Sequence, residues 1–412
     1  MTTKPQKNLA TVLFLTVFLA ACGGGGSDST PISNDSSDKS PGEVVPELIT
    51  SPPLRSTPDD QAGKPTDTPP VDTGSEPTEN DTQAALSANN EFSLARTSCG
   101  LGGLSVDTAL DNIAIRHANY IKYVFANSSP TSFNAHVENE ISNASSVTGK
   151  NNPFFSGLSF EDRLINANYL NARYGVTENI AQSVYYSSAG DFWSSDVVAS
   201  SMAKSLLSAP YHLRSLMLPA SSLVGTGMVS YKPDGKNPTT NRGYVLVSHA
   251  SGTKMTKDKT VSGIFTYPCQ DVTGTVTALY NETPDPVKNT GRNLRTDPIG
   301  QPVYISMPSA TKIKVSNIKF RDLQRAQDVP IQLLDYDNDP YLNTDYALPA
   351  NEAFILPITD ALNSCEAKRS TTQSQQCGLY GNTQYQVSFD VLVDNRALEK
   401  QSFTFTTGKV NY

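Results

Sequence analysis

Two histidines and one Glu-Asn pair are the side chains of this 412-residue chain whose types and order could build a site. His136 lies in FNAHVENE, Glu178 and Asn179 lie in VTENIAQSV, and His212 lies in SAPYHLRSLM. Pro210 predicts that a short helix begins just before His212, because proline needs no hydrogen-bond donor in a first helical turn. The helix dipole disfavours an imidazolium there, so we expect a neutral His212, the form that a metal ion requires.

The elements that must position these residues follow from hydrophobic periodicity. Residues 107–126 carry a helical apolar stripe that includes His117, which we interpret as a hydrogen-bonded core histidine. Ser159 and Asp162 predict a capping box at the start of a second helix, which we expect to run through Leu170. Gly175 then breaks the helix, so Glu178 should begin the next element, where free backbone donors can stabilise a carboxylate.

The remainder of this region predicts one more helix and a hairpin. A helical pattern over residues 196–207 leads directly to His212. Residues 223–231 and 242–250 alternate as two antiparallel strands, and the glycines of the first allow another backbone or a ligand to approach closely. His249 ends the second strand, and we interpret it as a partly exposed strand-end histidine.

The order of these motifs resembles a known family. His136, then Glu-Asn-Ile from Glu178, then the Pro-Tyr-His-Leu-Arg helix of His212, together with Arg163 in SFEDR, resembles the CAP superfamily of cysteine-rich secretory, antigen 5 and plant pathogenesis-related proteins, especially its bacterial branch. The resemblance covers about residues 98–268, less than half of the chain. It implies a fold and a cleft, but members of one fold family differ in activity.

The resemblance implies an α-β-α sandwich in which His136 and His212 face each other across the cleft, with Glu178 and Asn179 lining it. A divalent metal such as zinc would bind to His136 and His212, or a small or lipid ligand would bind in the cleft. Two histidines alone bind zinc weakly, and the second glutamate of the animal and plant pattern has no clear match before Ser208.

Three kinds of function stay open. The cleft could bind a metal or small ligand, the polar residues could be a structural cluster in an adhesive or structural envelope protein, or the site could be a metal-dependent hydrolase. Hydrolysis has little motif support, because the sequence has no HExxH, no GxSxG and no cysteine left unpaired as a nucleophile. We therefore assign no catalytic residue, and enzymatic activity is left open.

The amino terminus predicts a lipoprotein. Lys4 and Lys7 precede a short apolar run from Leu9 to Ala21, which is typical of a signal peptide over residues 1–21. The run ends in Leu-Ala-Ala-Cys-Gly, which resembles a bacterial lipobox with Cys22 as the lipidated residue; the alternative is an ordinary cleaved signal. The residue after the lipidated cysteine is Gly23, whereas an aspartate there would favour retention in the inner membrane. The resemblance therefore favours a lipoprotein of the outer membrane, on its periplasmic or surface-exposed face.

Residues 22–92 are predicted to be a disordered tether rich in Ser, Thr and Pro. Residues 23–90 contain twelve acidic and three basic residues, a net charge of −9, whereas the whole chain carries −8. The acidic balance therefore belongs to the tether, and no basic patch for nucleic acid is evident.

The five cysteines divide into Cys22 and an even set, which is consistent with an oxidising compartment. Four cysteines allow three pairings. We favour Cys99 with Cys269, which bracket the first folded domain (residues 93–269), and Cys365 with Cys377, which bracket a polar loop.

Residues 270–412 predict an all-β second domain. Seven β-rich runs alternate with turn residues, a pattern typical of a β-sandwich, over residues 272–280, 302–307, 312–319, 329–334, 353–356, 384–391 and 401–406. The last two runs resemble bacterial immunoglobulin-like modules, which are usually spacers or adhesive surfaces. Asp335, Asp337 and Asp339 suggest a calcium loop, but Pro340 stands where the loop needs glycine, which favours a solvated acidic turn.

Overall fold

The computed structural model of the chain describes residues 71–72, 81–188, 190–257, 261–360, 362 and 378–409. The chain is mixed α/β, with several sheets and few helices, as predicted at the level of fold class. Cys22, Cys365 and Cys377 lie outside the described residues, so the predicted lipid attachment and second disulfide are not visible. Among the described helices, none combines the length and apolar character needed to cross a membrane.

One four-stranded sheet organises the N-terminal unit, residues 81–257. Its strand order is β2, β5, β6, β3, formed by Ser105–Val106, Ser221–Tyr231, Asn241–Gly252 and Val176–Tyr186. Strands β5 and β6 are antiparallel neighbours, which confirms the predicted hairpin. Strand β3 is an edge strand of this sheet, and most of its residues are buried.

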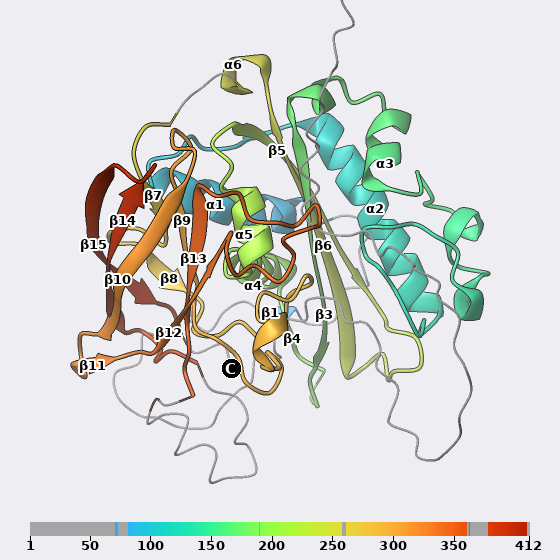
Figure 1. The fold of residues 1–412 in the computed structure, drawn as a ribbon. Helices are drawn as coiled ribbons and strands as arrows, with labels where there is room; N and C mark the ends of the chain where they lie inside the picture. Colours follow the sequence, from blue (N-terminus) through green and yellow to red (C-terminus); the bar gives the residue numbers. More distant parts are fainter. Residues whose placement is uncertain are drawn as a thin grey trace, which may run out of the picture.

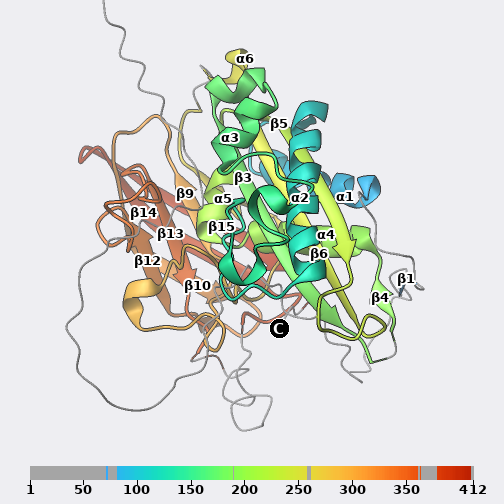
Figure 2. The same ribbon diagram turned by 90° about the vertical axis from the view of Figure 1, so that its right-hand side faces the viewer.

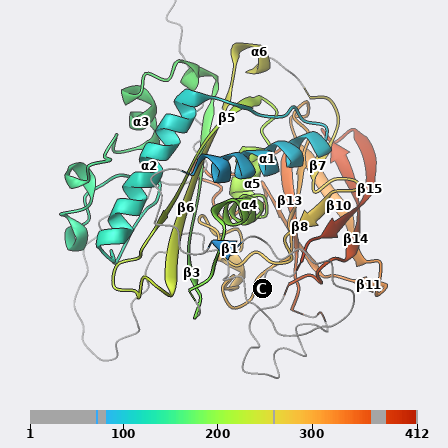
Figure 3. The ribbon, with the colours of Figure 1, turned by 180° about the vertical axis from the view of Figure 1, so that it is seen from behind.

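Helices cover both faces of this sheet. Figure 1 and Figure 3 show α2 (Thr108–Asn127) and α3 (Phe160–Asn166) on one side, and α1 (Thr82–Ser98), α4 (Ser195–Leu206) and α5 (Pro210–Leu216) on the other. Gly225 and Gly227 of β5 lie directly against α2: a Cβ on Gly225 would be 2.3 Å from the backbone nitrogen of Asp111. The predicted close approach at these glycines is therefore that of a helix backbone.

Local signals account for the helices on the α2 side. The Asp107 side chain accepts hydrogen bonds from two backbone N–H groups of the first turn of α2. Ser159 and Asp162 form the predicted capping box at the start of α3. The prediction that this helix continues through Leu170 is wrong, because α3 ends at Asn166 and Asn168 adopts a positive φ of 52° that no α-helix can contain.

Helix α1 begins inside the segment predicted as a tether. Asp81 caps it, and Ala84, Ala88 and Phe92 form a fully buried stripe on one of its faces. The spacing of four residues in this stripe is typical of a helix packed on a core. The tether was predicted from the composition of a longer segment, in which the polar residues before Asp81 outnumber the apolar residues of the stripe. The tether prediction therefore extends at least ten residues too far.

The C-terminal unit, residues 261–409, is built from two sheets. The first has the order β11, β10, β14, β15, β8, formed by Gln327–Asp328, Ile313–Asp322, Gln384–Val393, Ala397–Thr407 and Thr273–Thr275. The second has the order β12, β13, β9, β7, formed by Ile331–Asp335, Glu352–Pro357, Val303–Ser306 and Phe265–Tyr267. Each of the seven predicted runs overlaps one of these strands. Figure 2 looks at the α2 side and shows the C-terminal unit behind the N-terminal one.

Short elements complete the described chain. They are β1 (Val71–Asp72), β4 (Phe192–Trp193), α6 (Lys254–Lys257) and four 3-10 helices at Ser142–Ala144, Gly149–Asn151, Leu170–Tyr174 and Lys288–Thr290.

The two units share one apolar core and one disulfide. Buried side chains of α1, α4 and α5 pack continuously with those of both C-terminal sheets. The predicted disulfide between Cys99 and Cys269 is present, but it does not close the first domain on itself. Cys99 caps the end of α1, whereas Cys269 follows β7, which already pairs with β9 of the C-terminal unit. The disulfide therefore links the two units.

Candidate functional site

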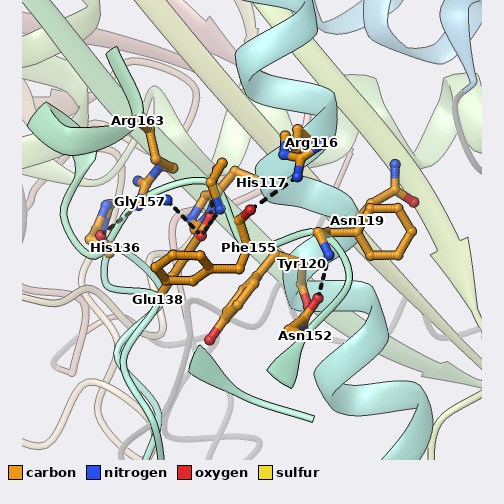
Figure 4. Close-up of polar contacts among 12 residues, drawn as sticks. Arg116, His117, Asn119, Tyr120, His136, Glu138, Asn152, Phe155, Gly157 and Arg163 are labelled. Carbon is orange, nitrogen blue, oxygen red and sulfur yellow. Dashed lines mark hydrogen bonds and ion pairs between the residues drawn. The ribbon is translucent and has the colours of Figure 1, made fainter. Parts of the chain in front are cut away.

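Glu178 is the centre of a buried polar cluster on the α2 side of the sheet. Both of its oxygens accept hydrogen bonds from Arg163 at 2.7 Å, Oε1 contacts Nδ1 of His136 at 2.9 Å, and Oε2 contacts Nε2 of His249 at 3.0 Å. Only 2 % of the Glu178 side chain is exposed, and none of the Arg163 side chain. Arg163 also donates to the carbonyl of His136 (Figure 4). Through its contacts with Glu178 and His136, the arginine joins β3 to the loop between α2 and α3.

These contacts keep Glu178 ionised. Burial by itself raises the pKa of Glu178, but the Arg163 charge and the neighbouring histidines outweigh burial and hold this pKa well below the ordinary value of 4.5. We expected free backbone donors to stabilise this carboxylate. The structure corrects that expectation: Glu178 lies within the extended strand β3 and not in a first helical turn, and side chains supply the compensating charge.

His249 contradicts its prediction. It is fully buried, contacts Glu178, and lies 4.9 Å from the ring of Phe160 between centroids. Burial lowers the pKa of His249 below 6.5, so it is held as the neutral imidazole. Strand pairing explains the position, because His249 lies directly opposite Glu178 across β3 and β6, and such cross-strand partners share a face. The predicted hairpin of β5 and β6 could not indicate this contact by itself, because the contact depends on β3 being the other neighbour of β6.

A second buried pair lies beside the first. His117 of α2 contacts Oε1 of Glu138 at 2.8 Å and the carbonyl of Ala135 at 2.7 Å, and neither His117 nor Glu138 is exposed (Figure 4). The interpretation of His117 as a satisfied core histidine is confirmed. Glu138 was missed; it also accepts hydrogen bonds from the backbone of Ser156 and Gly157, which fixes the loop before α3.

His212 begins α5, as predicted, but its carboxylate partner comes from the C-terminal unit. Oε1 of Glu282 contacts Nδ1 of His212 at 3.1 Å and accepts hydrogen bonds from the backbone of Tyr211 and His212 at 2.7 and 3.2 Å. Glu282 therefore caps the positive end of α5 across the junction. No sequence signal near Glu282 indicated this role, because the contact joins positions 70 residues apart.

Other residues of α5 strengthen the same junction. Tyr211 donates its hydroxyl to Asp339 at 3.0 Å, and Arg214 contacts Glu352 at 2.5 Å. Asp339 also accepts from the backbone of Leu348 and is only 3 % exposed, so the interpretation of a solvated acidic turn is wrong for this residue. Its oxygens are used to hold α5 and the following loop.

The site residues predicted from the sequence are divided between two places. The structure brings His136 and Glu178 into contact, whereas it pairs His212 with Glu282. Asn179 faces α5, where its Oδ1 accepts from Ser215 at 2.7 Å. The reason is strand geometry: neighbouring residues of β3 point to opposite faces of the sheet, so Glu178 and Asn179 serve different layers.

The two histidines that were expected to bind zinc lie in different polar clusters, and zinc binding stays a prediction. Among the described residues, no group of three or more histidine, cysteine, aspartate or glutamate side chains could hold a metal ion. His136 and Glu178 contact each other, and Arg163 already occupies both oxygens of the carboxylate. A cation bound to Glu178 would have to displace a buried guanidinium, which is costly.

A pocket of about 470 Å³ lies next to the Glu178 cluster, between α2, the loop before α3, and α3. Its walls are Ala109, Asn112, Ile113, Arg116, Phe155, Ser156, Arg163, Asn166 and Ala167. This volume falls within the range of small-molecule sites. Arg163 belongs to both features, since it contacts Glu178 and also lines the pocket. None of the other pocket residues was a candidate from the sequence.

Comparisons with known proteins add no assignment. A scan against models of protein families finds none that matches the chain, and a search of curated proteins finds no match. The CAP and immunoglobulin-like resemblances are thus interpretations of short motifs.

Proposed function

We propose that this chain is a cell-envelope lipoprotein whose N-terminal unit is a CAP-like module that binds a small molecule in the pocket between α2 and α3. The observation that carries the proposal is the pocket itself, which lies directly against the buried Glu178 cluster and shares Arg163 with it. A buried, charge-balanced cluster of this kind holds the walls of a site in place, because its central residues Glu178 and Arg163 are each restrained by at least two partners.

Binding is favoured over metal-dependent hydrolysis by the state of the polar groups. A hydrolase of this type needs a metal with an open position and a carboxylate near it as general base. Glu178 is enclosed and paired with Arg163, and Glu138 is enclosed and paired with His117. Neither carboxylate is placed to take a proton from a substrate. The C-terminal unit, which resembles immunoglobulin-like modules, would hold α5 through Glu282 and Glu352.

Pocket binding can be tested with a variant that fills the pocket. Ala109 is exposed on the first turn of α2 and lines the pocket, so Ala109→Trp should occupy it without disturbing the core. A library of small molecules is screened by thermal melting, since a ligand at 100 times its Kd stabilises the native state by about 2.7 kcal/mol. We expect compounds that raise the Tm of the wild type but not of Ala109→Trp.

The matched control is Ala397→Trp, which adds the same side chain at an exposed position of the C-terminal unit and should keep the response. Compounds that stabilise the wild type and Ala109→Trp equally would place binding elsewhere. A screen without any hit would favour the second candidate, a structural or adhesive envelope protein. That candidate is supported by the pairing of all four histidines of the chain with buried glutamates.

The envelope assignment rests on the signal peptide and on Cys22. Lipidation of Cys22 would anchor the module to a membrane, with the outer membrane favoured by Gly23. Cys22→Ser should release the chain from the membrane fraction. A variant that stays membrane-bound with unchanged mobility would show that the anchor lies elsewhere.

A further inference from the structure

We propose that the ligand of the α2–α3 pocket is a small organic anion, a compact apolar body with one carboxylate or phosphate group that pairs with Arg116. This inference rests on the proposed function, because it names the chemical class of ligand for that same pocket. It is carried by the charges and walls of the pocket.

Arg116 is the uncompensated charge of the pocket. It is exposed, lines the pocket, and donates to the carbonyl of Phe155 at 3.0 Å (Figure 4). In the described part of the chain, no carboxylate forms an ion pair with it. A guanidinium carries five N–H donors in a planar fork, so donors remain for an oxyanion.

Three acidic residues of α2 and the segments next to it have partners of their own. Asp111, one turn before it on α2, turns to β5 and accepts from the backbone of Thr226 at 2.8 Å. Asp107 caps α2, and Glu138 is enclosed by His117 and the Ser156 backbone. Each of these three carboxylates is bound to another partner and does not act as the counter-ion of Arg116.

Arg163 adds a second polar feature to the wall. Its terminal nitrogens contact Glu178 and the His136 carbonyl, but its Nε is buried and has no hydrogen-bond partner among the described residues. A buried donor without a partner costs free energy. The remaining walls include Ala109, Ile113 and Phe155, which suit an apolar body.

The test compares two probes of equal shape, 2-naphthoate and 2-naphthamide, by titration calorimetry on the full chain. We expect the wild type to bind the carboxylate about five times more tightly than the amide, the upper range for an exposed ion pair. Arg116→Gln should remove this preference while leaving amide binding unchanged. Arg396→Gln, which removes the same charge from an exposed position of the C-terminal unit, should keep the preference.

Three results would overturn the inference. Equal binding of both probes by the wild type would show that the pocket does not select anions, and a preference that survives Arg116→Gln would assign it to another group. Binding of neither probe at millimolar concentration would also refute it. The library screen with Ala109→Trp decides separately whether the pocket binds small molecules, so the two failures are distinguishable.

Discussion

Removal of the Glu178 carboxylate should destabilise the N-terminal unit strongly. In Glu178→Ala the Arg163 guanidinium, whose side chain is completely buried, would lose its counter-ion, and both His136 and His249 would lose a hydrogen-bond partner. Breaking a buried ion pair by removing one partner costs about 3–5 kcal/mol. Because a typical domain is stable by only about 5–15 kcal/mol, this loss is a large fraction of the total.

Urea unfolding followed by circular dichroism measures the effect. With a slope of about 2–3 kcal/mol per M, the midpoint should fall by about 1–2.5 M. Glu140→Ala, which removes an exposed glutamate from the same loop region, should change the midpoint little. The double variant Glu178→Met with Arg163→Met should recover much of the loss, because replacing both members of a buried pair by apolar residues is often neutral.

A loss below about 1 kcal/mol in Glu178→Ala would refute the reasoning, since it would mean that Arg163 reaches water or another anion. Additive losses in the double variant would refute it too, because two groups that stabilise each other through one contact must show coupling.

Three further predictions follow from particular contacts. Stability should decline as the pH falls below about 6.5, because burial lowers the pKa of His249 in the folded chain, so the unfolded chain binds this proton first. A second decline should begin below about 4.5, where the unfolded chain, but not the folded one, protonates Glu178. Thermal melting at a series of pH values measures both steps, and a Tm that is constant from pH 7 to 5 would contradict the first. Gly225→Ala should lower the free energy of unfolding by about 1–3 kcal/mol, because its Cβ would lie 2.3 Å from the α2 backbone. Gly102→Ala, which has open space around it, should leave this free energy almost unchanged, and chemical denaturation compares the two variants. Glu282→Ala should lower the free energy of unfolding by about 1–3 kcal/mol, because it removes the carboxylate that caps α5. Hydrogen exchange at the start of α5 should become faster, and unchanged exchange there would contradict the capping role.

Local signals in the sequence were sufficient for much of the fold. The apolar stripe of α2, the capping box of Ser159 and Asp162, and the proline that begins α5 each act within one or two turns of chain, so their consequences could be predicted without knowing the neighbours. The β5–β6 hairpin and the seven strand runs followed in the same way from alternation. The start of α1 was missed because a short alanine-rich stripe was averaged with the polar residues before it.

The partners of the polar residues were decided by tertiary structure alone. His249 differs from an exposed strand-end histidine only through its pairing with β3, which places Glu178 opposite it. Glu282 reaches His212 only because the C-terminal unit packs on α5, a contact between distant parts of the chain. His136 and His212 have different glutamate partners for the same reason. The alternation of side chains between the two faces of β3 is local, but the layer that covers each face depends on how the whole chain packs. Side-chain chemistry can be read from residue types, whereas the partner that neutralises each buried charge is selected by packing.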